Sequence, residues 1–590
     1  MWTTALGRWL PVAAVPASVY LAALLLIPIG TLFVYSMFHS SFFGIERSFT
    51  TENWSRIVHD PLYRTLILRS IWVALVVCAF TIPLSYAVAY AITFRFRHGV
   101  LVLFLLLAPM FASYVVRVFA WVLILGPTGL LNRAITGVGL SSEPWQFLNF
   151  GRFAVALTLV SVLVPLATLP IYSALQNVPR SLLEASRDLG EPPARTFFRV
   201  TLPLTLPAVG ASFAFVFLIS AADYVTPQLL GGRTGFMVGR AIVDQFGPAG
   251  NLPFGGALSL ATLLSLVVVL GIVFTLALSL RAALRRTADI DRVQNLFRRT
   301  SLKQASRRRS PLHRLPWLHA IVAMVALLLY APLIVLVVMS FSDLGVFPIH
   351  HLTISWYGQV FSTEGFTSSI FTSVKVAALC VGLSLAIGIP AGFALARRRF
   401  RLKGAVLGLN GAPLLVPGVV VGVAMLTVLG ALSLLPGFYP TVFAHVWLSL
   451  PFVVLIVQAR LLRFDTRVEE AARDLGSSYS RMLRTVTLPI IAPTLLAIVI
   501  VVWVWSMDEF LVSNFVVGVD TTLPVFLYSQ IRYGVTPVVN SVASIMLAAS
   551  LVVLVTTGLL FRVLARRSAA APDEAESFSA TLTSAHSGGH

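Results

Sequence analysis

Long apolar runs separated by short polar segments are the dominant pattern of this chain. Each run exceeds the roughly 20 residues that a helix needs to cross about 30 Å of hydrocarbon, so the pattern predicts an all-α polytopic membrane protein. The first run is longer than a signal-peptide core and lacks a clear cleavage site, so we expect it to remain as a helix. The twelve expected spans lie at about 10–38, 67–94, 99–126, 152–176, 204–231, 255–283, 317–341, 367–396, 404–432, 440–463, 489–517 and 539–565.

The twelve spans form two sets of six, joined by a strongly basic segment. Because six is an even number, both sets have the same orientation in the membrane, which predicts two parallel repeats. The tail is small, polar and mildly acidic, a composition typical of disorder. The expected regions are a first repeat at 1–283, a cytoplasmic linker at 284–316, a second repeat at 317–567 and a disordered cytoplasmic tail at 568–590.

Composition and charge support a membrane location. Hydrophobic residues make up 57% of the chain and charged residues 11%, far outside the range of soluble domains. The net charge of +20 is concentrated in loops beside spans, so we expect contact with lipid headgroups and no nucleic-acid partner. Lysine and arginine mark cytoplasmic loops. Basic segments follow spans two, eight and twelve, which predicts a multi-pass protein of the cytoplasmic (inner) membrane with both termini in the cytoplasm.

The sequence contains no motif for a disulfide, a metal site or a nucleotide-binding phosphate loop. Cys78 and Cys380 both stand in apolar runs, which indicates neither a disulfide nor a cysteine metal site. His350 and His351 form an isolated pair that we expect to be solvated, so no metal site is predicted. The chain has no Gly-x-x-x-x-Gly-Lys-Ser/Thr phosphate loop. We therefore expect a protein that is not an enzyme and has no cofactor.

The most informative polar stretch is a motif that occurs twice, beginning at Glu184 and at Glu470, 286 positions apart. In each copy a Glu-Ala pair is followed by a glycine six positions after the glutamate and, nine residues further on, by Val-x-Leu-Pro. Glutamate, alanine and leucine favour a helix, glycine permits a turn, and Leu-Pro can begin a new helix. Segments 181–207 and 467–493 are thus each predicted to form a short polar helix, a turn and a membrane span.

Both copies resemble the "EAA" loops of the membrane-spanning subunits of ATP-binding-cassette (ABC) importers. This resemblance implies the type I ABC importer permease fold (MetI-like), with the motif helix on the cytoplasmic face and its glutamate docked in an ATPase subunit. Two loops imply two ATPase copies, which would use the ATP and Mg²⁺, and a separate extracytoplasmic solute-binding protein. By position, the implied docking residues are Glu184, Ala185, Gly190, Glu470, Ala471 and Gly476.

Further stretches in both halves resemble the two permease subunits of spermidine/putrescine importers, here fused in one chain. They begin at Asp223 and Leu252 in the first half and at Ser506 and Gly534 in the second, and Asp508-Glu509 replaces the paired aspartates usual in the second subunit of that family. The resemblance implies a permease that passes a small polyamine by alternating access. Ferric-iron importers, which commonly carry two EAA loops in one chain, remain an alternative, as do phosphonate, opine and sulfate importers. A secondary transporter would have twelve helices but no need of EAA loops.

Three acids follow the Leu-Pro pairs by about 20 residues, which is roughly 30 Å along a helix. Asp223, Asp508 and Glu509 are therefore expected in the outer part of the membrane, where a carboxylate is a functional candidate. Asp223 and Glu509 occupy matching positions in the two repeats. The alternative is that these acids are solvated or cap a loop.

Aromatic residues and one arginine complete the predicted substrate pathway. Tyr224, Trp505 and Phe510 stand beside the acids, and aromatic faces with carboxylates suit a polycation. Arg117, in the third span, would repel a cation unless it is paired, with Asp223 as the candidate partner. An unpaired Arg117 would favour an anionic cargo instead.

Overall fold

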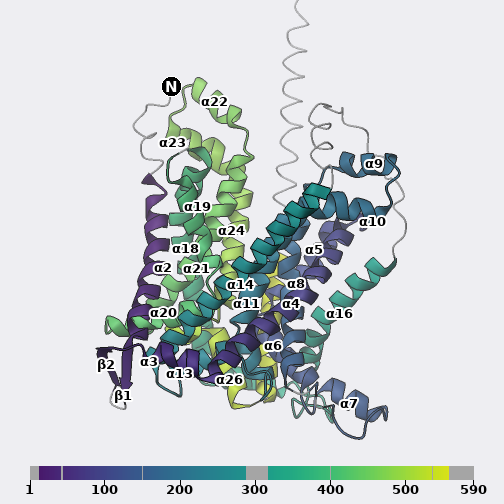
Figure 1. Ribbon diagram of the computed structural model, residues 1–590, viewed down its shortest axis with the longest axis vertical. Helices are drawn as coiled ribbons and strands as arrows, with labels where there is room; N and C mark the ends of the chain where they lie inside the picture. Colours follow the sequence, from purple (N-terminus) through teal and green to yellow (C-terminus); the bar gives the residue numbers. More distant parts are fainter. Residues whose placement is uncertain are drawn as a thin grey trace, which may run out of the picture.

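The structure, a computed structural model, describes residues 12–41, 44–145, 147–148, 150–287, 316–398, 400–534 and 536–556. These residues are mainly helical, and a single antiparallel hairpin joins strand β1 (Phe38–Ser41) to strand β2 (Gly44–Phe49) (Figure 1). Most of the predicted linker and all of the predicted tail lie outside the described residues.

The described elements of the first half run from the first span to the start of the predicted linker. They are α2 (Val15–Ser36), α3 (Glu52–His59), α4 (Pro61–Phe94), α5 (Gly99–Leu107), η1 (Ala108–Phe111), α6 (Tyr114–Leu125), α7 (Leu130–Gly137), α8 (Arg152–Gln176), α9 (Arg180–Asp188), α10 (Pro193–Thr196), η2 (Phe197–Thr201), α11 (Leu202–Ala221), α12 (Val225–Leu230), α13 (Val238–Phe246) and α14 (Leu252–Thr287).

The second half repeats much of this order. Its described elements are α16 (Pro316–Met339), α17 (Ser355–Ser362), α18 (Phe366–Arg397), α19 (Lys403–Gly411), η3 (Ala412–Leu414), α20 (Gly418–Ala431), α21 (Phe438–Leu462), α22 (Thr466–Asp474), α23 (Tyr479–Met482), η4 (Leu483–Thr487), α24 (Leu488–Asp508), α25 (Ser513–Val516), α26 (Leu523–Tyr533) and a last helix, Pro537–Thr556.

Eleven described helices are long and apolar enough to cross a membrane, and a bent pair makes a twelfth if it counts as one span. Two predicted spans are wrong as continuous helices. The run at 99–126 divides into α5, η1 and α6, and the run at 404–432 bends by 97° between the α19–η3 helix and α20. Each break follows an Ala-Pro pair in a short 3-10 turn, where the ring of proline removes a backbone donor.

Two further predicted spans end earlier than their apolar runs. The run at 204–231 is helical as α11 only to Ala221 and resumes as the short helix α12, while the run at 489–517 is helical as α24 only to Asp508. The predicted acids therefore stand at the ends of these helices, where the chain turns.

The first span of each half packs against the other half. Helix α2 lies on α20, α18 and α19, among the green helices of the second half, as well as on α14 of its own half, and α16 lies on α4 and α6 of the first half (Figure 1). The Tyr20 hydroxyl on α2 donates a hydrogen bond to the Phe443 carbonyl at 2.6 Å, and the Tyr330 hydroxyl on α16 donates to the Leu105 carbonyl at 2.6 Å. This exchange joins the two repeats into one body.

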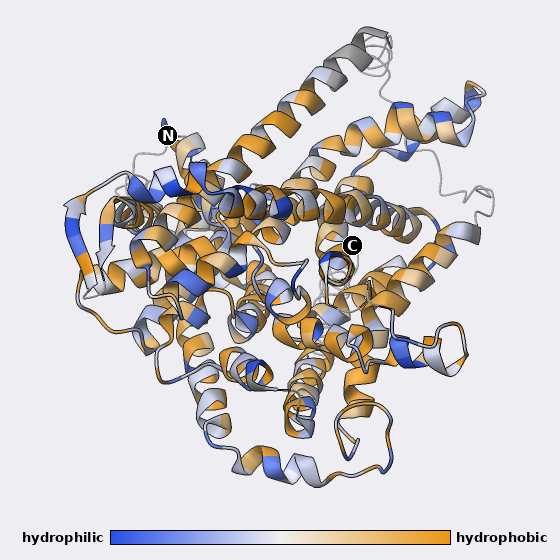
Figure 2. Ribbon diagram, turned by 60° about the horizontal axis from the view of Figure 1, so that its bottom comes forward, coloured by the Kyte–Doolittle hydropathy of each residue, from blue (hydrophilic) through white to orange (hydrophobic). Residues whose placement is uncertain are grey.

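Polar segments gather at the two ends of the bundle. The motif helices α9 and α22 stand at one end, whereas the hairpin, α7 and α26 stand at the other (Figure 1). Hydrophobic residues cover the long helices between them, and hydrophilic residues are more frequent in the hairpin and in the segments at the ends of the bundle (Figure 2). The two motif copies therefore lie on the same face of the molecule.

Candidate coupling and transport sites

Each motif copy forms the predicted helix, turn and membrane helix. Helices α9 and α22 each end two positions before a glycine whose φ angle is positive, +75° at Gly190 and +83° at Gly476. Positive φ strains any residue with a Cβ atom, so glycine is favoured at both turns. The chain then passes through α10 and η2, or α23 and η4, before the Leu-Pro pair begins α11 or α24.

The motif side chains form an exposed surface at the end of each half. Glu184 and Glu470 are exposed, Ala471 is exposed and Ala185 is half-buried. Sequence reasoning missed two leucines at this surface, Leu189 and Leu475, which are 80% and 88% exposed directly before the glycines. Their signal was present, because they too stand 286 positions apart. Exposed leucine beside an exposed acid offers a partner both apolar and charged contacts.

Two matched acids cap short helices beyond the fifth spans. Asp223 is 3% exposed and accepts hydrogen bonds from the first two N–H groups of α12, at 3.3 and 3.1 Å. Glu509 is 9% exposed and accepts from the backbone N–H groups of Val512 and Ser513, at 3.1 and 3.0 Å. These bonds satisfy donors that a helix start leaves free. The loop-capping role considered for the acids is thus present at both positions.

Asp508 makes contacts of a different kind, because its partners belong to the other half. Its Oδ1 accepts from the backbone N–H of Tyr114 at 2.7 Å, and the Tyr114 hydroxyl donates to Asp223 Oδ1 at 2.7 Å. Tyr114 therefore bridges one acid from each repeat. We call the group formed by Tyr114, Asp223, Asp508 and Glu509 the seam cluster.

The predicted pairing of Arg117 with Asp223 is wrong. Arg117 Nη2 lies 3.9 Å from Asp508 Oδ2, and its Nε donates to the Ala112 carbonyl at 3.1 Å. The reason is that α6 packs on α16 and α26 of the second half, and Asp508 binds the backbone N–H of Tyr114 at the start of α6, one helical turn from Arg117. Arg117 is nonetheless paired, as the polycation hypothesis requires.

Aromatic side chains join the seam cluster, with one exception. The ring of Tyr224 lies 5.8 Å from Phe510, and the Tyr224 hydroxyl donates to the Leu511 carbonyl at 3.3 Å. Tyr224 and Phe510 are each 1% exposed. Trp505 instead packs against Phe452 of α21, with ring centroids 5.1 Å apart. The predicted pathway residues therefore converge, except that Trp505 packs to one side.

A buried histidine supports the second half of the seam and was missed from the sequence. His445 is fully buried in α21, and its two ring nitrogens lie 2.7 Å from the hydroxyls of Ser506 and Ser513. Its Nε2 also lies 3.8 Å from Glu509 Oε2. A single histidine in an apolar run gives no motif, and its first-half counterpart is Leu159, so the repeat gave no signal either.

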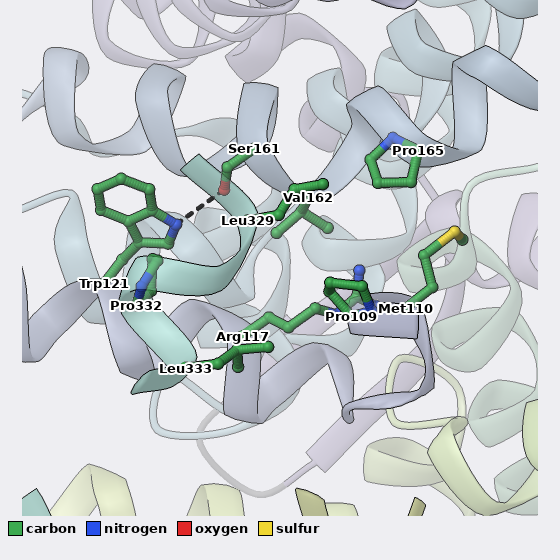
Figure 3. A pocket seen from close by; sticks show the side chains of 10 residues that line it. All are labelled: Pro109, Met110, Arg117, Trp121, Ser161, Val162, Pro165, Leu329, Pro332 and Leu333. Carbon is green, nitrogen blue, oxygen red and sulfur yellow. Dashed lines mark hydrogen bonds between the residues drawn. The ribbon is translucent and has the colours of Figure 1, made fainter. Parts of the chain in front are cut away.

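Arg117 also borders a small apolar pocket between α6, α8 and α16 (Figure 3). Proline and aliphatic side chains supply most of the lining, and Trp121 is fixed there by donating to the Ser161 hydroxyl at 2.8 Å. The lining contains a cation and no acid. The pocket therefore offers an ammonium group no ionic partner, in contrast to the seam cluster.

Both halves match one protein-family model, described as the binding-protein-dependent transport system inner membrane component, at residues 13–286 and 388–569. The chain belongs to this family. It is a multi-pass permease of the inner membrane with two parallel repeats of the ABC-importer type. The predicted fold class is thereby confirmed.

The permease is also similar to curated relatives. It is 35% identical over 237 residues to the spermidine/putrescine transport system permease protein PotC of Escherichia coli K12, covering 40% of this chain and 89% of the relative. It is 32% identical over 218 residues to PotB of the same organism, covering 37% and 78%. PotC of Haemophilus influenzae is 34% identical over 236 residues, covering 40% and 92%. PotB and PotC match separate halves, as expected for a fusion.

Proposed function

We propose that the permease passes a polyamine such as spermidine or putrescine across the inner membrane by alternating access. The observation that carries this proposal is the seam cluster, in which acids from both halves meet around Tyr114. Its relatives in both halves are named for spermidine and putrescine transport, which agrees with a cationic cargo.

The chemistry of the seam suits an extended cation with several ammonium groups. Asp508 is held by Tyr114 and Arg117, both from the first half, so these contacts join the two halves. An ammonium group can replace Arg117 as the ionic partner of Asp508, because both are donors to a carboxylate. Tyr224 and Phe510 add aromatic faces that attract cations. Arrival of the cargo would then release the contacts that hold the halves together.

The proposed motors are two ATPase subunits, one docked on α9 and one on α22. Glu184 and Glu470 are exposed and would each form a charge-assisted contact with the ATPase. Leu189 and Leu475 would add apolar contacts beside them. A separate solute-binding protein would deliver the cargo at the opposite end, as the family's name indicates.

Orientation follows from docking, since the ATPase is cytoplasmic. The α9 and α22 end would face the cytoplasm, and the end with the hairpin, α7 and α26 would face outward. Helix α17 belongs to that outer end, because its Phe361 packs on Phe366, which packs on Phe526 of α26. Single cysteines at the exposed positions Ser480 and Ser362, in a variant lacking Cys78 and Cys380, test this. An impermeant thiol reagent should label position 362 on intact cells and miss position 480. The reverse labelling would overturn the orientation.

Transport itself is tested in proteoliposomes that contain the permease, its ATPase and its binding protein. Labelled spermidine, putrescine and ferric iron are offered separately, with and without ATP. We expect ATP-dependent uptake of a polyamine and none of iron. Uptake of iron alone would replace the polyamine proposal with the ferric-iron alternative.

A further inference from the structure

The two motif helices are fixed to the protein by different chemistry. In the second half, Arg397 Nη2 donates to Glu469 Oε1 at 3.0 Å, and the Thr487 hydroxyl donates to the same oxygen at 2.9 Å. We call these three residues the clasp. It joins the end of α18, the motif helix α22 and the last residue of η4, directly before α24.

The clasp is better shielded than an ordinary surface ion pair. The side chains of Arg397 and Glu469 are 18% and 15% exposed, and Thr487 is fully buried. The guanidinium of Arg397 also lies over the ring of Phe464, 5.4 Å from its centroid. Exposed ion pairs contribute little, whereas a partly buried, charge-assisted bond with a second donor is stronger and holds one geometry.

Adjacent glutamates of α22 face in different directions. Successive residues on a helix point about 100° apart. Glu469 therefore turns inward to the clasp while Glu470, the motif glutamate, is exposed. One acid is placed for a contact within the chain and the next for a contact outside it.

Among the described residues, the first half does not carry the clasp's charged pair at the matching positions. Glu469 and Thr487 correspond to Leu183 and Thr201 at the repeat offset, and Arg397, seven residues after the Ile-Pro pair of α18, corresponds to Tyr90 after the Ile-Pro pair of α4. Neither charged member of the clasp is kept.

The first motif is held instead by contacts within its own loop. The hydroxyls of Ser186 and Thr196 lie 2.9 Å apart, and Arg199 donates to Glu191 at 2.8 Å. Ser186 is the residue that departs from the motif's usual alanine, so its hydroxyl has a local role. The Ser186–Thr196 contact ties α9 to α10, and the Arg199–Glu191 pair closes the turn that follows, whereas the clasp ties α22 to a membrane span.

We propose that the clasp is the coupling link of the second half, which passes movement of the ATPase-docked helix α22 to the span α18. This inference rests on the proposed docking of an ATPase at α22. Helix α18 packs along α21 and α24, so displacement of its end is transmitted to the second-half bundle. Arg397 and Glu469 are positioning residues, and the first half couples through softer, local contacts.

The test compares docking with coupling in Glu469→Gln, Arg397→Gln and the exchanged pair Arg397→Glu with Glu469→Arg. Docking is the amount of ATPase that co-purifies with the permease. Coupling is the polyamine uptake per ATP hydrolysed in proteoliposomes. Each single variant should keep the ATPase but lower coupling about fivefold, and the exchanged pair should regain at least half. Leu183→Gln, the matched control in the first half, should leave coupling unchanged.

The possible outcomes separate this inference from the docking proposal. Normal coupling in both single variants, or loss of the ATPase from them, would overturn the role of the clasp. A Glu470→Ala variant with normal ATPase binding and uptake would instead overturn docking at α22. Thr487→Val, which removes one donor and little volume, serves if the exchanged pair does not fold. It should lower coupling in the same direction by a smaller factor, and unchanged coupling would count against the clasp.

Discussion

The two halves share their backbone devices but differ in their polar chemistry. Both have a positive-φ glycine after the motif helix, an Ala-Pro break in the third span and an acid that caps a short helix beyond the fifth span. Among the described residues, Tyr114 and Arg117 come from the first half, whereas Asp508, His445 and the clasp come from the second.

This difference teaches which features the fold requires. A turn, a break and a cap are needed wherever the chain takes that path, so both repeats keep them. A hydrogen bond or ion pair between the halves needs a donor from one half and an acceptor from the other. The two fused repeats can therefore carry different polar residues at matching positions. The predictions below use the matched positions as internal controls.

The largest effect should come from the acids of the seam. We predict that Asp223→Asn, Asp508→Asn and Glu509→Gln together abolish polyamine uptake while the ATPase still co-purifies, because amides keep the shape but not the charge that attracts ammonium groups. Among single variants, Asp508→Asn should reduce uptake most, since its contacts cross the seam and 24% of its side chain is exposed. Uptake assays with labelled spermidine measure this. Unchanged uptake in the triple variant would leave the acids with a structural role only.

The second-largest effect on transport should come from the motif glutamates, Glu184 and Glu470. Each Glu→Ala change at 184 and 470 removes a proposed charge-assisted contact of about 1.5–3 kcal/mol. We predict correctly inserted protein with reduced transport, and by far the lowest transport in the double variant. The two single variants need not reduce transport equally, because the first copy has Ser186 where the motif has alanine. Co-purification of the ATPase measures docking directly, and normal uptake by the double variant would remove the assignment.

His445→Leu tests the second-half seam by copying the residue of the first half, Leu159. The change removes the ring that joins Ser506 to Ser513 and leaves buried hydroxyls with fewer partners, at a cost of about 1–3 kcal/mol. We expect a lower unfolding temperature in detergent. Leu159→Ile, a change of shape without polarity, is the control and should have the smaller effect. Equal unfolding temperatures for His445→Leu and the parent would show that the histidine network adds no stability.

The sequence predicted features that depend on local pattern. Apolar length located the spans, and the repeated motif located two helices whose glutamates are exposed. It could not predict the breaks at the Ala-Pro pairs. Hydrophobicity shows how long an apolar run is, but it does not show whether the helix within that run is continuous. Contacts between distant residues were also out of reach. Tyr114 and Asp508 are 394 positions apart, so the true partner of Arg117 had no local signal.

The smallest effect, and the cleanest comparison, should come from Gly190→Ala and Gly476→Ala. A Cβ atom at either position meets no heavy atom within 4 Å, so the substitution adds backbone strain without a steric clash. Holding alanine at positive φ costs about 1 kcal/mol, which is about fivefold in an equilibrium constant. Because both turns have nearly the same φ, the two variants should weaken ATPase binding by similar factors. Binding titrations with purified ATPase measure the factors, with Ser480→Ala as a control at an exposed position beyond the second turn. A much larger loss of ATPase binding for Gly476→Ala than for Gly190→Ala would contradict this prediction and would show that α9 and α22 contribute unequally to ATPase binding. The clasp predicts a difference between the halves in coupling and none in ATPase binding.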